Sequence, residues 1–177
     1  MRKLFLSGEV DSASIKTIIG EILNFNDYDA REKKLKSSYV REPIVLFINS
    51  PGGNVYDGFA LVDIIKASKT PIYTICIGHC MSMGLIVFLA GHKRYIGKNS
   101  TIMIHGASFL EYGKTPEAEE ALNEAKRLEE MFAEIIVETT KIKKKQIEEI
   151  ITMRSNWYVS AAQAIKLGIA DGFLTSY

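Results

Sequence analysis

The sequence has little of what several protein classes require. Cys76 and Cys80 are its only cysteines, and neither stands at a Cys/His spacing that would hold zinc, so a disulfide-stapled scaffold and a zinc domain are not expected. Its longest uninterrupted apolar run, residues 85–90, is far too short to cross a bilayer. We therefore expect both thiols to be reduced and buried, in a protein without a membrane span.

An excess of charge of one sign is also missing. Lys and Arg together number 22 and Asp and Glu 21, for a formal net charge of +1. Nucleic acid and anionic membranes are recognised by clusters of one sign, so neither is expected as a partner. The apolar residues at the N-terminus end at Ser7, too early for a secretory leader, and a cytoplasmic protein is expected.

Length and composition indicate one folded domain. A chain of 177 residues can bury one sizeable core but is short for two. With 47% apolar and 24% charged residues, the chain is typical of globular proteins and unlike a disordered or fibrous one. Strand-like and helical patterns alternate, which predicts an α/β domain with a mostly parallel sheet and an extending helical arm.

The pattern predicts the elements in order. Short apolar runs predict strands at residues 4–6, 44–48, 72–77, 94–96 and 101–104. Apolar residues at helical spacing predict helices at residues 15–23, 55–65, 85–90, 116–139, 143–151 and 160–167. The expected caps are Asp11 or Ser12, Asn54 and Ser160. Residues 26–42 are expected to form a polar connection.

Ser82 stands at the corner between the strand predicted at residues 72–77 and the helix predicted at residues 85–90. The first amides of a helix have no partner within it and can hold an oxyanion, while glycines at 78 and 84 allow a close approach. A serine at this corner is either a nucleophile or an ordinary helix cap. Cys80 lies nearby, but no base is indicated for it, and we do not expect it to be the nucleophile.

Two further segments are expected at the same edge of the sheet, because the C-terminal ends of parallel strands lie together. His105 ends one predicted strand and the pair Gly52-Gly53 ends another. A serine hydroxyl needs an imidazole to take its proton, and the resulting oxyanion needs amides to hold it. His105 is the candidate base, and Gly53 and Met83 could supply the amides.

Other interpretations of the histidines stay open. His79 is a candidate base, but it lies so near Ser82 along the chain that its ring could not easily turn back toward the serine hydroxyl. His92 is another, in a polar turn. His105 taken alone could equally be a packed histidine at the end of a strand.

In this order the motifs resemble the proteolytic subunit of the Clp protease, a caseinolytic serine peptidase (ClpP). The segments on which this resemblance rests are FINSPGG at 47–53, TICIG at 74–78 with MSMG at 81–84, and NSTIMIH at 99–105. A weaker similarity extends over residues 160–171. Together they extend over nearly the whole chain from Arg2 onward. The spacing from the glycine pair to the serine matches the family without a gap.

The resemblance implies a ClpP/crotonase-like fold with a parallel β-sheet core and a protruding helical handle. It implies a serine endopeptidase that acts through an acyl-enzyme, without metal or cofactor. Carried over by position, Ser82 is the nucleophile, His105 is the general base, and the oxyanion hole consists of two amides, those of Gly53 and Met83.

The resemblance also implies an architecture and an assembly. Residues 1–177 would form a single domain, with a head of about residues 1–112 and 154–177 and a handle of about residues 113–153. The helix predicted at residues 116–139 falls where the family's handle interlocks two rings. We therefore expect a homo-oligomer of heptameric rings, stacked as a tetradecamer around a chamber that admits polypeptide substrates.

The chain departs from the family at its third catalytic residue. That residue is an Asp four positions before the Ser-Ala that opens the last helix, and counting back from Ser160 gives Asn156, or Ser155 with a shift of one. An amide oxygen can accept from a histidine ring N–H and fix its tautomer, but it cannot stabilise imidazolium by charge. We expect a slower peptidase, or one that is activated by its context.

The second departure is at the N-terminus. The family's first strand follows a segment that forms axial pore loops and helps engage an AAA+ unfoldase, whereas only three residues precede the strand predicted at residues 4–6. Regulated coupling to an unfoldase is therefore doubtful on this evidence. The expected alternatives are cleavage of short peptides, an unregulated or accessory particle, or a phage-type relative that processes capsid proteins.

Two competing functions remain. A crotonase-like acyl-CoA enzyme shares the fold and the paired-amide oxyanion hole, but the pairing of Ser82 with His105 and the lack of a basic adenine-binding cluster argue against it. The second competing function is that of a weakly active or inactive subunit of a mixed ring. It stays open because Asn156 stands where the family has a catalytic carboxylate.

Overall fold

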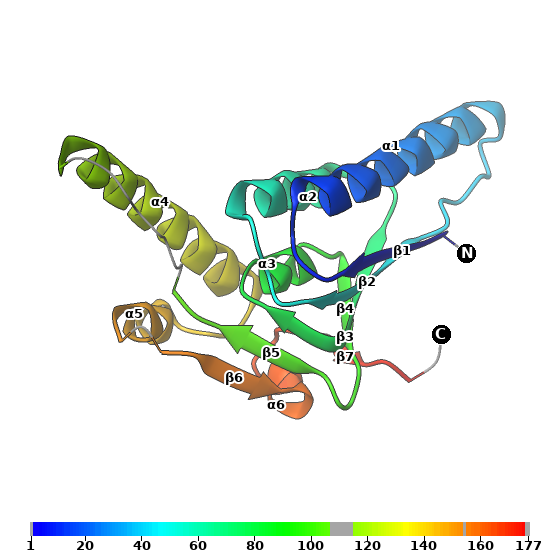
Figure 1. Cartoon of the computed structure of the whole chain (residues 1–177). Coiled ribbons are helices and arrows are strands. Elements are labelled where there is room, and N and C mark those ends of the chain that lie inside the picture. The colour runs from blue at the N-terminus through cyan, green and yellow to red at the C-terminus, as the bar shows by residue number, and fades with distance from the viewer. Residues whose placement is uncertain (1, 107–114, 154, 176–177) are drawn as a thin grey trace.

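Figure 1 shows the computed structural model, which describes residues 2–106, 115–153 and 155–175, as one sheet with helices packed around it. Its strands are β1 (Arg2–Ser7), β2 (Ile44–Ser50), β3 (Ile72–Met81), β4 (Lys93–Ile96), β5 (Thr101–Ile104), β6 (Trp157–Ser160) and β7 (Gly172–Phe173). Its helices are α1 (Ser12–Leu35), α2 (Val55–Ala67), α3 (Met83–Leu89), α4 (Thr115–Thr139), α5 (Lys144–Thr152) and α6 (Ala161–Lys166).

The sheet is mostly parallel, as the alternating pattern predicts. Its main path runs β1-β2-β3-β4-β7, and β5 and β6 branch from β3. Only the β5–β6 pair is antiparallel among the described strands. The sequence pattern did not assign β6 as a strand. A strand of four residues, with alternate side chains exposed, carries too weak a periodic signal to be recognised.

The first helix is much longer than the sequence predicts. α1 continues to Leu35, so the polar connection expected at residues 26–42 is wrong over most of its length. Asp11 is the N-cap residue, and its carboxylate accepts a hydrogen bond from the Ser14 amide within a capping box. Leu23, the last residue of the helix predicted at residues 15–23, has 48% of its surface exposed.

Helix α1 extends because its buried face continues with a charged residue. Asp29 is fully buried and accepts two hydrogen bonds from the Arg2 guanidinium, at 2.6 and 2.7 Å. The Tyr39 and Thr70 hydroxyls each donate a further bond to it at 2.6 Å. Burial raises the pKa of Asp29, but these hydrogen bonds outweigh it and lower the pKa to about 2. A pattern that counts only apolar residues therefore ends the helix too early.

Strand β3 changes partner halfway along its length. Residues 73–76 pair with β4, and residues 79–81 pair with β5. Between the halves, Asn49 of β2 faces three residues of β3, which is a β-bulge. Gly78 in the bulge has φ +71°, and a Cβ there would lie 2.5 Å from the Asn49 Oδ1. Because the bulge redirects the second half of β3 towards β5, it also sets the position of Ser82.

The core is formed by the sheet, α2 and α3. All seven residues of α3 are buried, so this helix runs through the interior beneath α2. Cys76 and Cys80 are both buried and free, as expected. No described helix is both long and apolar enough to cross a membrane.

Helices α4 and α5 form the arm expected from the sequence. Figure 1 shows α4 leaning away from the sheet, with its C-terminal half near α3. Leu128 and Ile136 are buried there, whereas Leu122, nearer the outer end, is 52% exposed. The Tyr56 hydroxyl donates to Glu124 at 2.8 Å and so ties the start of α2 to α4.

Candidate active site

Ser82 occupies a strained corner between β3 and α3. It has φ +49° and ψ −126°, and it is the only described residue other than glycine with a positive φ. Such strain persists only where the surrounding structure imposes it, and it is typical of serine nucleophiles at strand–helix turns. Ser82 stands at the N-cap position of α3, but its side chain makes no capping hydrogen bond. The ordinary interpretation as a helix cap therefore does not account for this serine.

The chain after β2 packs directly against this corner. A Cβ at Gly52 would lie 2.8 Å from the Ser82 Cβ, 2.9 Å from the Met81 carbonyl oxygen and 3.0 Å from the Met83 nitrogen. The φ of Gly52 is +102°, which also favours glycine. The Ser50 hydroxyl is buried and accepts a hydrogen bond from the Gly52 amide at 3.2 Å. Gly52 is thus within contact distance of Ser82, and Gly53 lines the same pocket as the serine.

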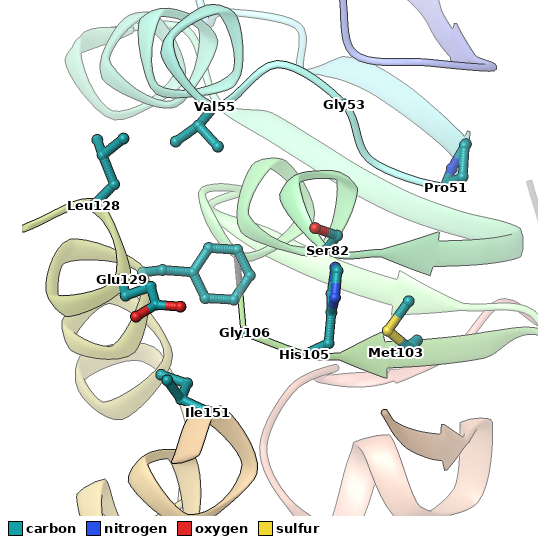
Figure 2. A pocket seen from close by; sticks show the side chains of 11 residues that line it. Pro51, Gly53, Val55, Ser82, Met103, His105, Gly106, Leu128, Glu129 and Ile151 are labelled. Carbon is teal, nitrogen blue, oxygen red and sulfur yellow. The ribbon is translucent and has the colours of Figure 1, made fainter. Parts of the chain in front are cut away.

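His105 follows the last residue of β5, next to the serine corner. The Ser82 amide donates to the Met103 carbonyl at 3.0 Å, which joins the corner to β5. Figure 2 shows the His105 ring beside the Ser82 side chain, and both residues line one pocket. No hydrogen bond joins the two side chains in the described part of the chain. Such bonds are often loose without substrate. Burial lowers the pKa of His105, which favours the neutral ring that a base requires.

The two expected oxyanion amides lie at the same corner. Met83 is the first residue of α3, where amides have no partner within the helix. Gly53 forms an isolated parallel bridge with Val10, in which the Val10 amide donates to Gly52 and the Asn54 amide donates to Val10. This bridge does not use the Gly53 amide. Neither amide donates to another described residue in a turn or loop.

Asn156 precedes β6 and is exposed. The antiparallel register pairs Ile104 with Trp157, and one further step brings Asn156 opposite His105. Directly opposed residues in such a ladder have Cβ atoms about 4.5–5.5 Å apart. Ser155, one residue further, would face the other way because side chains alternate. The register therefore favours Asn156 over Ser155 as the neighbour of His105.

The pocket has a volume of about 300 Å³ and lies between the sheet edge and the α4–α5 arm. Its lining residues are Pro51, Gly53, Val55, Ser82, Met103, His105, Gly106, Leu128, Glu129, Phe132 and Ile151. Sequence motifs identify the side of the pocket that carries Ser82 and His105 but miss the side that comes from α4 and α5. The helix predicted at residues 116–139 gives no indication by itself that Leu128, Glu129 and Phe132 line this pocket.

The other candidate groups do not line the pocket. The Ile72 amide donates to Nδ1 of His92 at 3.1 Å, which ties this ring to the start of β3. His79 is in the part of β3 that pairs with β5 and does not line the pocket. Burial raises the pKa of the Cys80 thiol well above its ordinary value, which makes it unreactive. No group of three or more His, Cys, Asp or Glu among the described residues could hold a metal ion.

A hydroxyl and an imidazole with a lowered pKa that line one pocket, with the amides of Gly53 and Met83 close in sequence or space to the serine, suit acyl transfer. The class that this fold and arrangement suit is therefore a hydrolase that acts through an acyl-enzyme. A sequence model of the family described as Clp protease matches residues 1–176. The chain belongs to the Clp protease family and is a protease, so the resemblance and the α/β fold inferred from the motifs are confirmed.

Two relatives show the extent of the similarity. The ATP-dependent Clp protease proteolytic subunit of Deinococcus radiodurans is 31% identical over 172 residues, which cover 96% of this chain and 78% of the relative. A protein of the same description from Borreliella afzelii is 29% identical over 178 residues, which cover 98% of this chain and 83% of the relative. The match extends over both the sheet and the α4–α5 arm.

Proposed function

We propose that the chain is a serine endopeptidase in which Ser82 is the nucleophile and His105 the general base. The observation that carries this proposal is the strained backbone at Ser82. The Ser82 hydroxyl makes no capping hydrogen bond, and Ser82 lines the same pocket as His105. Both curated relatives are described as proteolytic subunits of a Clp protease, which supports the same activity. Nothing in the fold or the comparisons favours an acyl-CoA enzyme.

The proposed reaction has two balanced steps. In the first, the Ser82 Oγ bonds to the peptide carbonyl carbon as its proton passes to His105, and the amides of Gly53 and Met83 hold the oxyanion. The C–N bond then breaks as His105 returns the proton to the leaving amine. In the second step a water molecule, deprotonated by His105, attacks the ester. Its proton returns to Oγ, which releases the acid and the free serine.

Asn156 is proposed as the third member of the site, in a positioning role. Its side-chain oxygen can accept from the His105 ring N–H that faces it, which leaves the other ring nitrogen free to act as the base. It supplies no negative charge when the ring becomes imidazolium. We therefore propose a peptidase that works more slowly than one with a carboxylate at this position.

The proposed assembly follows the names of the relatives. Both describe subunits of ATP-dependent proteases, which supports a ring homo-oligomer with an ATPase partner for this chain and not an isolated peptidase. The head would comprise about residues 1–112 and 154–177, and the handle about residues 113–153. The α4–α5 arm in Figure 1 supports this division, because it extends away from the sheet.

The direct test is labelling of the purified chain with a fluorophosphonate probe, followed by intact-mass analysis, with Ser82→Ala as the control. We expect one adduct on the parent chain and none on the variant. Cys80→Ala should label like the parent, because its thiol is buried away from the pocket. An assembled protein that takes up no probe would contradict the proposal and favour an inactive subunit of a mixed ring.

A further inference from the structure

The two proposed oxyanion amides come from segments that are far apart in the sequence. Met83 begins α3, whereas Gly53 belongs to the loop between β2 and α2. Their N–H groups can hold one oxyanion only if this loop and the first turn of α3 keep a fixed spacing. A residue that contacts both segments would therefore influence the reaction without touching the substrate.

Ser50, the last residue of β2, contacts both segments. Its side chain is fully buried, and its Oγ accepts a hydrogen bond from the Gly52 amide at 3.2 Å. The same side chain packs on α3, because a Cβ at Gly84 would lie 3.1 Å from the Ser50 Cβ and 3.2 Å from its Oγ. One small side chain thus joins the loop that carries Gly53 to the helix turn that carries Met83.

Both backbone groups of Gly52 are held in place. Its N–H donates to Ser50, and its carbonyl oxygen accepts from the Val10 amide at 2.8 Å. In a trans peptide the C=O and N–H groups point in opposite directions. The Gly53 N–H therefore points away from the Val10 amide that binds the preceding carbonyl. Of the two anchors only Ser50 uses a side chain, so it is the one that a substitution can remove.

We propose that Ser50 is a positioning residue for the oxyanion hole and sets the spacing between the Gly53 and Met83 amides. The proposal rests on the proposed serine peptidase function and extends it to a residue that does not line the pocket. Alanine at this position would fit the space but leave the buried Gly52 N–H without its acceptor, so the loop would shift. An oxyanion donor has to lie about 2.7–3.1 Å from the oxygen that it holds. A small shift therefore weakens the transition state more than it weakens substrate binding.

The test compares kcat and KM for a fluorogenic peptide in the parent chain and in Ser50→Ala. We expect kcat to fall about tenfold, which is less than the loss of about a hundredfold or more that follows removal of a whole oxyanion donor. KM should stay within about twofold of the parent value, because the ground state carries no oxyanion. A rise in KM with kcat unchanged would overturn the inference.

An inhibitor pair gives a second measurement. A peptide boronate that forms a tetrahedral adduct with the Ser82 hydroxyl should lose about tenfold in affinity for Ser50→Ala, in step with kcat. A peptide of the same sequence without the boronate should bind both chains equally. Equal losses for the two ligands would contradict a role in the oxyanion hole.

The matched control is Ser100→Ala. Ser100 is also a buried serine with a hydrogen bond to the backbone, which its hydroxyl donates to the Cys76 carbonyl at 3.1 Å, but it lies outside the pocket. Urea unfolding should show similar shifts in midpoint for the two variants, whereas only Ser50→Ala should lower kcat and boronate affinity. An equal fall in kcat in both variants would point to general destabilisation and overturn the inference.

Two further comparisons keep the outcomes distinct. Ser50→Cys keeps a weak acceptor in a similar shape, so its kcat should lie between those of the parent and Ser50→Ala. If Ser50→Ala does not fold, a parent-like kcat in Ser50→Cys would still refute the role. Fluorophosphonate labelling of the parent tests the underlying function. A parent that does not label refutes the peptidase itself, whereas a labelled parent whose kcat is unchanged by Ser50→Ala refutes only the role of Ser50.

Discussion

Replacing Asn156 by aspartate should restore a negative charge beside His105. The β5–β6 register brings position 156 opposite position 105 when it is continued by one step, at a separation of about 5 Å between Cβ atoms. Because position 156 is exposed and His105 is half-buried, an effective dielectric of about 40–80 applies, and the attraction between carboxylate and imidazolium is about 1–2 kcal/mol. This corresponds to about one pKa unit and about tenfold in rate.

The assay is the pH dependence of kcat/KM for peptide hydrolysis. In the parent chain burial lowers the pKa of His105, so the rate should rise with pH through a midpoint below the ordinary value of about 6.5. In Asn156→Asp the anion favours the protonated ring and moves this midpoint upwards by about one unit. The plateau should rise by about tenfold, because the same charge stabilises the imidazolium that forms in the transition state.

The matched control is Ser155→Asp. It introduces the same charge one residue away, where the alternation of a strand turns the side chain to the other face. An unchanged plateau and midpoint in Asn156→Asp would refute the proposed register and the role of Asn156. A gain in Ser155→Asp without one in Asn156→Asp would assign the position to Ser155. A titration of the His105 ring by NMR would give the pKa independently of turnover.

Two further predictions concern the scaffold. Gly52→Ala should destabilise the fold by about 2–4 kcal/mol in urea unfolding and abolish probe labelling, because its Cβ would lie 2.8 Å from the Ser82 Cβ at a positive φ. A variant of parent stability that labels normally would contradict this packing. Asp29 has a pKa of about 2 in the folded chain, below its unfolded value of about 4. The stability that it adds, about 2–3 kcal/mol, should be present above pH 5 and lost as the pH falls towards 2. Asp29→Asn should remove this acid-dependent part, whereas the exposed control Asp27→Asn should retain it, and equal slopes in the two variants would refute the buried network.

Much of the sheet edge that carries Ser82 and His105 could be predicted from the sequence, because the motifs that indicate it are short and local. Residues 72–90 carry the pattern of a strand, a glycine-flanked corner and an apolar helix, and one hydrogen bond of the turn, from the Leu85 amide to the Ser82 carbonyl, joins residues close in sequence. His105 follows directly from the end of its strand. These segments meet because the C-terminal ends of parallel strands lie at one edge, a general property of such sheets. The strained backbone of Ser82, with its hydroxyl free of a capping role, was visible only in the structure.

Features that depend on distant partners were missed. Helix α1 continues past Asn26 because Asp29 is paired with Arg2 of strand β1, and no periodicity in the helix segment itself shows that pairing. Strand β6 is stabilised by β5, some fifty residues earlier in the chain. A short strand gains its hydrogen bonds only from such a neighbour, so its own sequence is ambiguous.

The sequence by itself determined the family, the α/β class and the edge of the sheet that carries Ser82 and His105. It could do so because short motifs specify a turn, and the side chains placed on it, through local geometry. The tertiary structure decided which residues complete the pocket. Glu129 and Ile151 come from two helices whose positions depend on packing against α3 and on the Tyr56–Glu124 contact. Packing of this kind is a property of the whole folded chain, and spacing along the sequence does not encode which face of α4 meets the serine.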